Sequence, residues 1–147
     1  MVPLDKSSFA NFAKVRSCGG ELRVFVPYTS PELTRSGLAA ATVLVKNLDA
    51  RITLFVVQIV PFPLPLDRPN VSREFLEQKL TAIASEVEAH VIGQVIYARD
   101  LNFGIEQVLP PSSLIVMATQ KTWWPTSEAK LARALVAVGH NVALLEV

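Results

Sequence analysis

The sequence predicts an α/β fold in which helices cover both faces of a parallel sheet. Three observations lead to this prediction. Five short apolar runs alternate with four segments of helical periodicity, which gives the order βαβαβαβαβ. The runs are almost wholly apolar rather than alternating, as is typical of strands buried on both faces. The chain of 147 residues is also long enough for one domain with its own core.

The first elements are expected just after the "CGG" of residues 18–20. The run "LRVFVP" (22–27) is rich in β-favouring residues and predicts a strand. A helix is expected over 30–48, because Ser30 is placed to cap it and the following proline suits the first helical position. The next strand is "RITLFVVQIV" (51–60), and the loop after it contains four prolines, which prevent regular structure.

The second helix, expected over 71–90, has the clearest pattern. Leu76, Leu80, Ile83 and Val87 recur on one face, and acidic and basic residues occupy the rest. The remaining elements follow in order: a strand over 91–98, a helix over 100–109 capped by Asp100, a strand over 113–119, a helix over 126–138 and a final strand over 141–147.

Residues 1–20 are expected to form an N-terminal extension, and residues 21–147 the domain. The glycine pair at its end favours a hinge. The extension is interpreted either as a flexible tail or as a short amphipathic arm, since Phe9, Phe12 and Val15 can share one helical face.

Composition excludes several classes of function. Fourteen Lys and Arg oppose thirteen Asp and Glu without a long basic run, so no nucleic-acid partner is expected. Cys18 is the single cysteine, so neither an intrachain disulfide nor a cysteine metal cluster is expected. Mean hydropathy is +0.35, but no apolar run reaches the ~18 residues of a membrane-spanning helix. The N-terminus lacks the apolar core of a signal peptide, and a cytoplasmic location without membrane insertion is expected.

Three segments carry a resemblance to a known family: "VFVPYTSPELTRSGLAAA", "ARITLFVVQIV" and "SLIVMAT". In this order and spacing the chain resembles the universal stress protein family from residue 22 to residue 147. The resemblance implies a three-layer α/β/α sandwich whose five-stranded parallel sheet has the order 3-2-1-4-5. It also implies a homodimer, formed by pairing of the last strands.

The last strand itself favours a dimer. In that order "NVALLEV" lies at an edge, yet it has no Pro or Lys and Glu146 is its only charge. An unguarded apolar edge is an aggregation hazard, and two-fold pairing is the simplest cover. The expected interface residues are Val142, Leu144, Leu145 and Val147. The alternative is that the N-terminal extension covers this edge within one chain.

A ligand site is expected where the strand order reverses, beyond the carboxyl ends of the first and fourth strands. In nucleotide-binding members of the family an Asp near the first strand engages the nucleoside, and a glycine motif after the fourth wraps the phosphates. In this chain Thr29 stands at the Asp position, and Ala118 and Lys121 stand at the first two glycines. The resemblance gives these candidate positions: Pro27, Tyr28, Thr29, Val57, Met117, Ala118, Lys121, Thr126 and Ser127.

The missing glycines argue against ATP binding of the family kind. No glycine lies between Gly104 and Gly139, and a phosphate cradle needs backbone N–H groups in close approach, often at positive φ. No cofactor is therefore expected, with ATP and AMP disfavoured. Thr126 and Ser127 at a helix start, with Lys121 nearby, leave an anion site open. The alternative is that they only cap the helix.

Trp123 and Trp124 lie in this same loop. Three interpretations are open: a ring plugs the vacated nucleotide pocket, with Tyr28 joining it; the pair forms a partner or dimer surface; or the rings stack on an aromatic ligand.

Catalytic motifs are absent from the sequence. There is no Gly-x-Ser-x-Gly turn and no zinc spacing, and His90 and His140 fall at strand starts, away from the ligand edge. We therefore expect no catalytic residue and no metal. The expected function is a dimeric, universal stress protein-like regulatory or binding module without standard ATP binding. The alternatives are an adenine-nucleotide binder with a remodelled phosphate loop, and an enzyme of unknown reaction at the cleft between the first and fourth strands.

Overall fold

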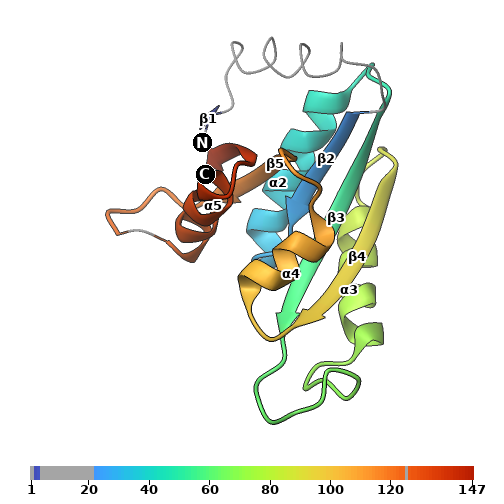
Figure 1. Cartoon of the computed structure of the whole chain (residues 1–147). Helices are drawn as coiled ribbons and strands as arrows, with labels where there is room; N and C mark the ends of the chain where they lie inside the picture. The colour runs from blue at the N-terminus through green and yellow to red at the C-terminus, as the bar shows by residue number, and fades with distance from the viewer. Residues whose placement is uncertain (1, 4–21, 125) are drawn as a thin grey trace.

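The computed structural model describes residues 2–3, 22–124 and 126–147 (Figure 1). Every strand pair is parallel, and the sheet order is β1-β6-β5-β2-β3-β4. The strands are β1 (Val2–Pro3), β2 (Leu22–Pro27), β3 (Ala50–Ile59), β4 (Val91–Ala98), β5 (Leu114–Thr119) and β6 (Asn141–Glu146). The five longer strands confirm the predicted α/β class and the order 3-2-1-4-5. Residues 4–20, with the predicted arm and hinge, lie outside the described residues.

Each of the four described helices begins at a side-chain cap. Ser30, Ser72, Asp100 and Thr126 each accept a hydrogen bond from the backbone N–H three residues ahead, which satisfies one of the free donors of the first turn. The helices are α2 (Pro31–Val45), α3 (Arg73–Ala84), α4 (Leu101–Val108) and α5 (Ser127–Ala137). The predicted caps at Ser30 and Asp100 are therefore confirmed.

Two helices end earlier than the sequence pattern predicts. Helix α3 stops at Ala84, six residues before the predicted end, where the Ser85 hydroxyl donates to a carbonyl of the last turn and competes with the helical pattern. Val87 still packs against the core without being helical. Helix α2 stops at Val45, and Asn47 then adopts a left-handed φ of 65°, which turns the chain toward β3.

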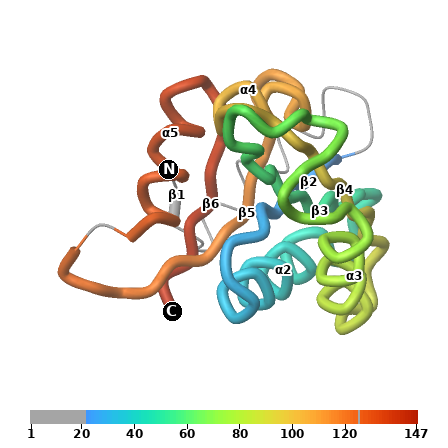
Figure 2. The backbone as a smooth tube through the Cα atoms, turned by 90° about the horizontal axis from the view of Figure 1, so that it is seen from below, coloured from blue at the N-terminus to red at the C-terminus, as the bar shows by residue number. Residues whose placement is uncertain are grey.

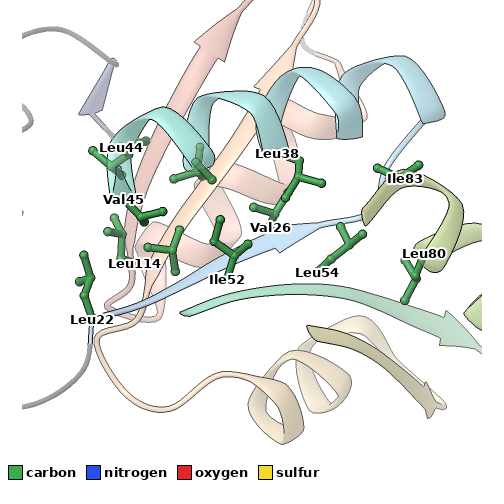
Figure 3. Packing of buried hydrophobic residues seen from close by; sticks show 14 of the residues in the cluster. Leu22, Val26, Leu38, Leu44, Val45, Ile52, Leu54, Leu80, Ile83 and Leu114 are labelled. Carbon is green, nitrogen blue, oxygen red and sulfur yellow. The ribbon is translucent and has the colours of Figure 1, made fainter. Parts of the chain in front are cut away.

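The helices form two layers with the sheet between them (Figure 2). Helices α2 and α3 cover one face, and Figure 3 shows Leu38 and Leu44 of α2 above Val26 and Ile52 of the sheet. Helices α4 and α5 cover the other face, where Ile105 and Leu135 pack on the second core cluster. This three-layer arrangement buries both faces of the strands, which explains why their sequences are so uniformly apolar.

A sixth strand, β1, lies on the outer edge of β6, and the sequence pattern did not predict it. Val2 and Pro3 of β1 pair with Ala143 and Leu144 in parallel register. Proline is tolerated in such an edge strand because an edge has one unpaired side. For these two residues the structure matches the alternative in which the N-terminal extension covers the β6 edge within one chain.

Candidate functional site at the carboxyl ends of β2 and β5

The fold brings the two predicted loop segments to one edge of the sheet. Strands β2 and β5 are neighbours, with Val24 opposite Leu114 and Phe25 opposite Ile115. The chain leaves β2 into α2 on one face and leaves β5 into α5 on the other. This is the position at which the strand order reverses and at which open α/β sheets bind ligands.

Polar groups at the end of β2 hold the turn itself. The backbone N–H of Tyr28 donates to the carbonyl of Phe55 over 2.7 Å, which extends the β2–β3 ladder. The N–H of Thr29 donates to Oγ1 of Thr34 over 3.0 Å, and Ser30 caps α2. Pro27, the last residue of β2, is buried. The candidate residues Pro27, Tyr28 and Thr29 therefore form part of the turn that leads into α2. None of the three has a carboxylate that could engage a nucleoside.

The end of β5 is buried and closely packed. Met117 and Ala118 are 1% and 2% exposed. Helix α2 crosses directly over them at Gly37, where an added Cβ would lie 3.4 Å from the Cα of Met117. Neither residue is therefore free to form the wall of an open pocket.

The loop after β5 continues the sheet before it leaves it. The N–H of Val147 donates to the carbonyl of Thr119 over 2.9 Å, and the N–H of Lys121 donates to the carbonyl of Val147 over 3.1 Å. The backbone at Lys121, the second glycine position of the resemblance, is thus tied to the end of the chain. This N–H group cannot also face a phosphate.

Thr126 acts as a cap, as one of the two interpretations predicts. Its Oγ1 accepts from the N–H of Ala129 over 3.1 Å and lies 2.6 Å from Oγ1 of the buried Thr119. Ser127 is exposed and donates to the Glu128 carboxylate in the first turn of α5. A carboxylate at this position complements the helix dipole and repels an incoming anion.

The two tryptophans are both in solvent, so the interpretation as a pocket plug is wrong. Trp123 is 99% exposed and Trp124 is 82% exposed. Because the loop starts along the end of β6, residues 120–124 project away from the sheet rather than back over the cleft (Figure 2). Tyr28 does not join them, since it packs against the core on the α2 and α3 side. The partner surface and ligand stacking remain predictions.

Val57 lies beneath α4. An added Cβ on Gly104 would stand only 2.3 Å from Cγ1 of Val57, so the helix backbone rests directly on this side chain. The position that the resemblance assigns to an adenine pocket is therefore in contact with α4 and only partly exposed.

A hollow of about 270 Å³ does lie beside the tryptophan loop, on the β6 side of β5. Lys121 and Arg133 place two cationic side chains along it, and Glu146 adds a carboxylate. Arg133 was not among the predicted site residues. The available signal was its position on α5, seven residues after Thr126, which places both on one helical face.

Two of the residues that the structure describes have a shifted pKa, and neither lies at the ends of β2 and β5: His140 precedes β6 at the opposite edge of the sheet, and Tyr97 lies at the carboxyl end of β4, two strands from β2. Burial lowers the pKa of His140, whose Nδ1 accepts from the N–H of Ser113 over 3.1 Å at the start of β6. Burial also raises the pKa of Tyr97, whose hydroxyl donates to the carbonyl of Val71. Among the described residues there is no cluster of His, Cys, Asp or Glu that could hold a metal ion. Nor does any helix in the described ranges have the length and apolar character to cross a membrane.

Compared with protein-family models and with curated protein sequences, the chain matches none. Solved structures do match. The universal stress protein UspA from Lactobacillus plantarum superposes with a TM-score of 0.52 at 15% identity, covering 86% of this chain and 99% of that one. A universal stress protein in complex with cAMP gives a TM-score of 0.48 at 12% identity, covering 88% and 98%. The sheet order, the helix layers and the UspA superposition agree: this chain folds as a UspA-like domain.

Proposed function

We propose that the protein is a UspA-like regulatory or binding module that does not bind ATP through a glycine-rich phosphate loop. The observation that carries this proposal is the state of the backbone after β5. The N–H of Lys121 is bonded to the carbonyl of Val147, and the N–H of Ala129 in the first turn of α5 is bonded to the Thr126 hydroxyl. Phosphate recognition at such a junction relies on N–H groups that are free to point at the ligand.

Three further features support the proposal. Thr29 supplies a hydroxyl where a nucleoside-binding carboxylate is expected, and its N–H is already used by Thr34. Val57 is partly buried by the backbone of α4. Glu128 places a negative charge within the first turn of α5, where an anion would otherwise be attracted.

The module is proposed to act in the cytoplasm through protein contacts, as a homodimer that uses the β6 edge. The side chains expected at that interface differ in availability. Val147 is 54% exposed, and Leu144 and Leu145 are partly buried, whereas Val142 lies within the core of its own chain. Val142 can therefore contribute only its backbone to an interface. Trp123 and Trp124 are the most exposed large apolar side chains beside this edge and favour a partner surface.

A thermal-shift screen tests the proposal. A ligand at about a hundred times its Kd stabilises a native protein by ~2.7 kcal/mol. ATP, AMP and cAMP at about 1 mM are each expected to leave the Tm unchanged. A rise of several degrees with any of them, reproduced at a second nucleotide concentration, contradicts the proposal. A known nucleotide-binding universal stress protein, run alongside, shows that the assay detects binding.

One observation favours a second candidate, an adenine-nucleotide binder with a remodelled loop. The hollow beside the loop combines two cations, Lys121 and Arg133, with two exposed indoles. In this candidate an indole stacks on the base and the cations hold the phosphates. It predicts that adenine nucleotides quench tryptophan fluorescence and that Lys121→Ala abolishes the quenching. Lys130→Ala is the control, because Lys130 is an exposed lysine of α5 that does not line the hollow.

A further inference from the structure

Among the described residues, β1 occupies the outer edge of β6, and β1 is short. Strand β1 contributes two residues, which pair with Ala143 and Leu144, while β6 runs from Asn141 to Glu146. Most of the length of this edge strand is thus not paired with β1. The strand carries no Pro or Lys, and Glu146 at its end is its only charge, so it has few of the usual sequence guards against pairing with another chain.

The position of β1 matters for any two-fold pairing of β6. If β6 pairs with its copy in antiparallel register over its full length, Asn141 lies opposite Glu146 of the other copy. The centre of that ladder then falls between Ala143 and Leu144. These are the two residues with which β1 pairs. A second copy and β1 therefore require the same backbone groups, and they cannot occupy the edge together.

We propose that β1 is an intramolecular competitor of self-association, and that the β6 edge accepts either β1 of its own chain or β6 of a second copy. The inference rests on the dimer part of the proposed function. Release of β1 from both copies precedes or accompanies pairing. If each chain holds β1 on the edge with a preference of about tenfold, the apparent dimer Kd is raised about a hundredfold, because both copies must release it.

The tryptophan loop lies next to the same edge. The N–H of Lys121 bonds to Val147 at the end of β6, so the loop begins where the β6 edge ends. In the antiparallel pairing, the carboxyl end of one β6 lies beside the amino end of the other. Trp123 and Trp124 of one copy then face the end of α5 of the other, where Val136 and Val138 are 37% and 60% exposed. This contact gives the exposed indoles an apolar surface of the second copy to cover.

A reversible lock tests the competition in the full chain. The variant Pro3→Cys/Leu144→Cys/Cys18→Ser joins paired positions of two neighbouring strands, whose spacing of ~4.8 Å suits a disulfide. The reduced protein is the matched control, and multi-angle light scattering over a range of concentrations gives the dimer Kd of each form. The reduced form is expected to dimerise, and the oxidised form to remain monomeric at concentrations at least tenfold higher.

Three results overturn the proposal. Equal dimerisation of both forms means that β1 does not compete for the association surface. A disulfide that links two copies instead of closing within one chain means that β1 pairs in trans. A monomer in both forms removes the self-association that β1 is proposed to control. None of these results depends on nucleotide binding, so the thermal-shift screen can still succeed or fail by itself.

The wild-type chain provides a second measurement that does not depend on the folding of a variant. Backbone ¹³C chemical shifts of Val2 and Pro3 are followed by NMR at increasing protein concentration. They are expected to move from strand values toward those of an unstructured chain as dimers form, while the shifts of β6 keep strand values. Shifts of Val2 and Pro3 that do not change with the degree of dimerisation contradict the proposal.

Discussion

Substitution of Gly104 by alanine tests how closely α4 packs on the sheet. An alanine Cβ would stand 2.3 Å from Cγ1 of Val57 and 3.2 Å from Cβ of Ala98. Real Cβ contacts are never as short as the first distance, so α4 or Val57 must move. The χ1 angle of valine is stiff, which leaves little freedom for Val57 to rotate away.

Two opposing effects determine how much Gly104→Ala changes the free energy of unfolding. Overpacking of a core typically costs about 1–3 kcal/mol, whereas replacing glycine by alanine within a helix gains up to about 1 kcal/mol in helix propensity. The 2.3 Å contact places this site at the upper end of the overpacking range, so the difference predicts a net loss of about 1–2 kcal/mol in the free energy of unfolding for Gly104→Ala. With a urea m-value of about 2 kcal/mol/M, in the middle of the usual range, this loss lowers the unfolding midpoint by roughly 0.5–1 M.

The matched control is Gly37→Ala. Gly37 also lies within a helix, but its nearest contacts would be 3.4, 3.5 and 3.6 Å, so this substitution is expected to be neutral or stabilising. Combining Gly104→Ala with Val57→Ala removes the clashing methyl group and is expected to recover most of the loss caused by Gly104→Ala in that background. The reasoning is refuted if Gly104→Ala is as stable as the wild type, or if its loss is the same with and without Val57.

Two further predictions concern capping and pH. Thr126→Ala is expected to lower the free energy of unfolding by about 1 kcal/mol, because it removes the α5 cap; Ser127→Ala, at an exposed position, is the control, and an equal effect of both would contradict the assignment of the cap. Burial lowers the pKa of His140, so the unfolded chain takes up a proton where the folded chain does not. Stability from this group is present above about pH 6.5, the unfolded value, and is lost as the pH falls below it. The variant His140→Asn keeps a hydrogen-bond acceptor for the N–H of Ser113. Between about pH 7.5 and about pH 5.0 it is expected to lose less free energy of unfolding than the wild type, as measured by urea titration. An equal loss in both proteins would exclude His140 as a cause of the pH dependence.

The pattern of elements was accessible from sequence because both faces of the sheet are buried. The strand over 91–98 and the helix starts at Ser30 and Asp100 were located from apolar runs and capping residues. The ends of helices were less accessible. The pattern of α3 extends through Val87, yet the helix stops at Ala84, where the Ser85 hydroxyl bonds to the carbonyl of Ala82. Val87 still reaches the core without being helical.

The candidate site was predictable in place but not in detail. Topology alone puts Thr29 and Lys121 at one edge of the sheet. The direction of the tryptophan loop depends on the bonds that join Lys121 and Thr119 to Val147, and no local sequence pattern encodes such long-range pairing. The plug interpretation assumed that a large apolar ring is buried when a pocket is near. Here the backbone ties outweigh that tendency and leave Trp123 in solvent.

Strand β1 has only two residues, which is too short for sequence periodicity to predict it. Val2 and Pro3 show neither alternation nor a run of β-favouring residues, and their pairing depends on the edge that β6 presents. The unguarded character of that edge was visible in the sequence, although the sequence did not choose between the N-terminal segment and a second copy.

The central claim is that the loop between β5 and α5 no longer holds phosphate. Isothermal titration calorimetry of ATP into the full chain, with and without Mg²⁺, tests it most directly. The account predicts no saturable heat at protein concentrations of about 100 μM, which places any Kd above ~1 mM, weaker than about −4 kcal/mol. A one-to-one isotherm with a micromolar Kd that Lys121→Ala abolishes would contradict it.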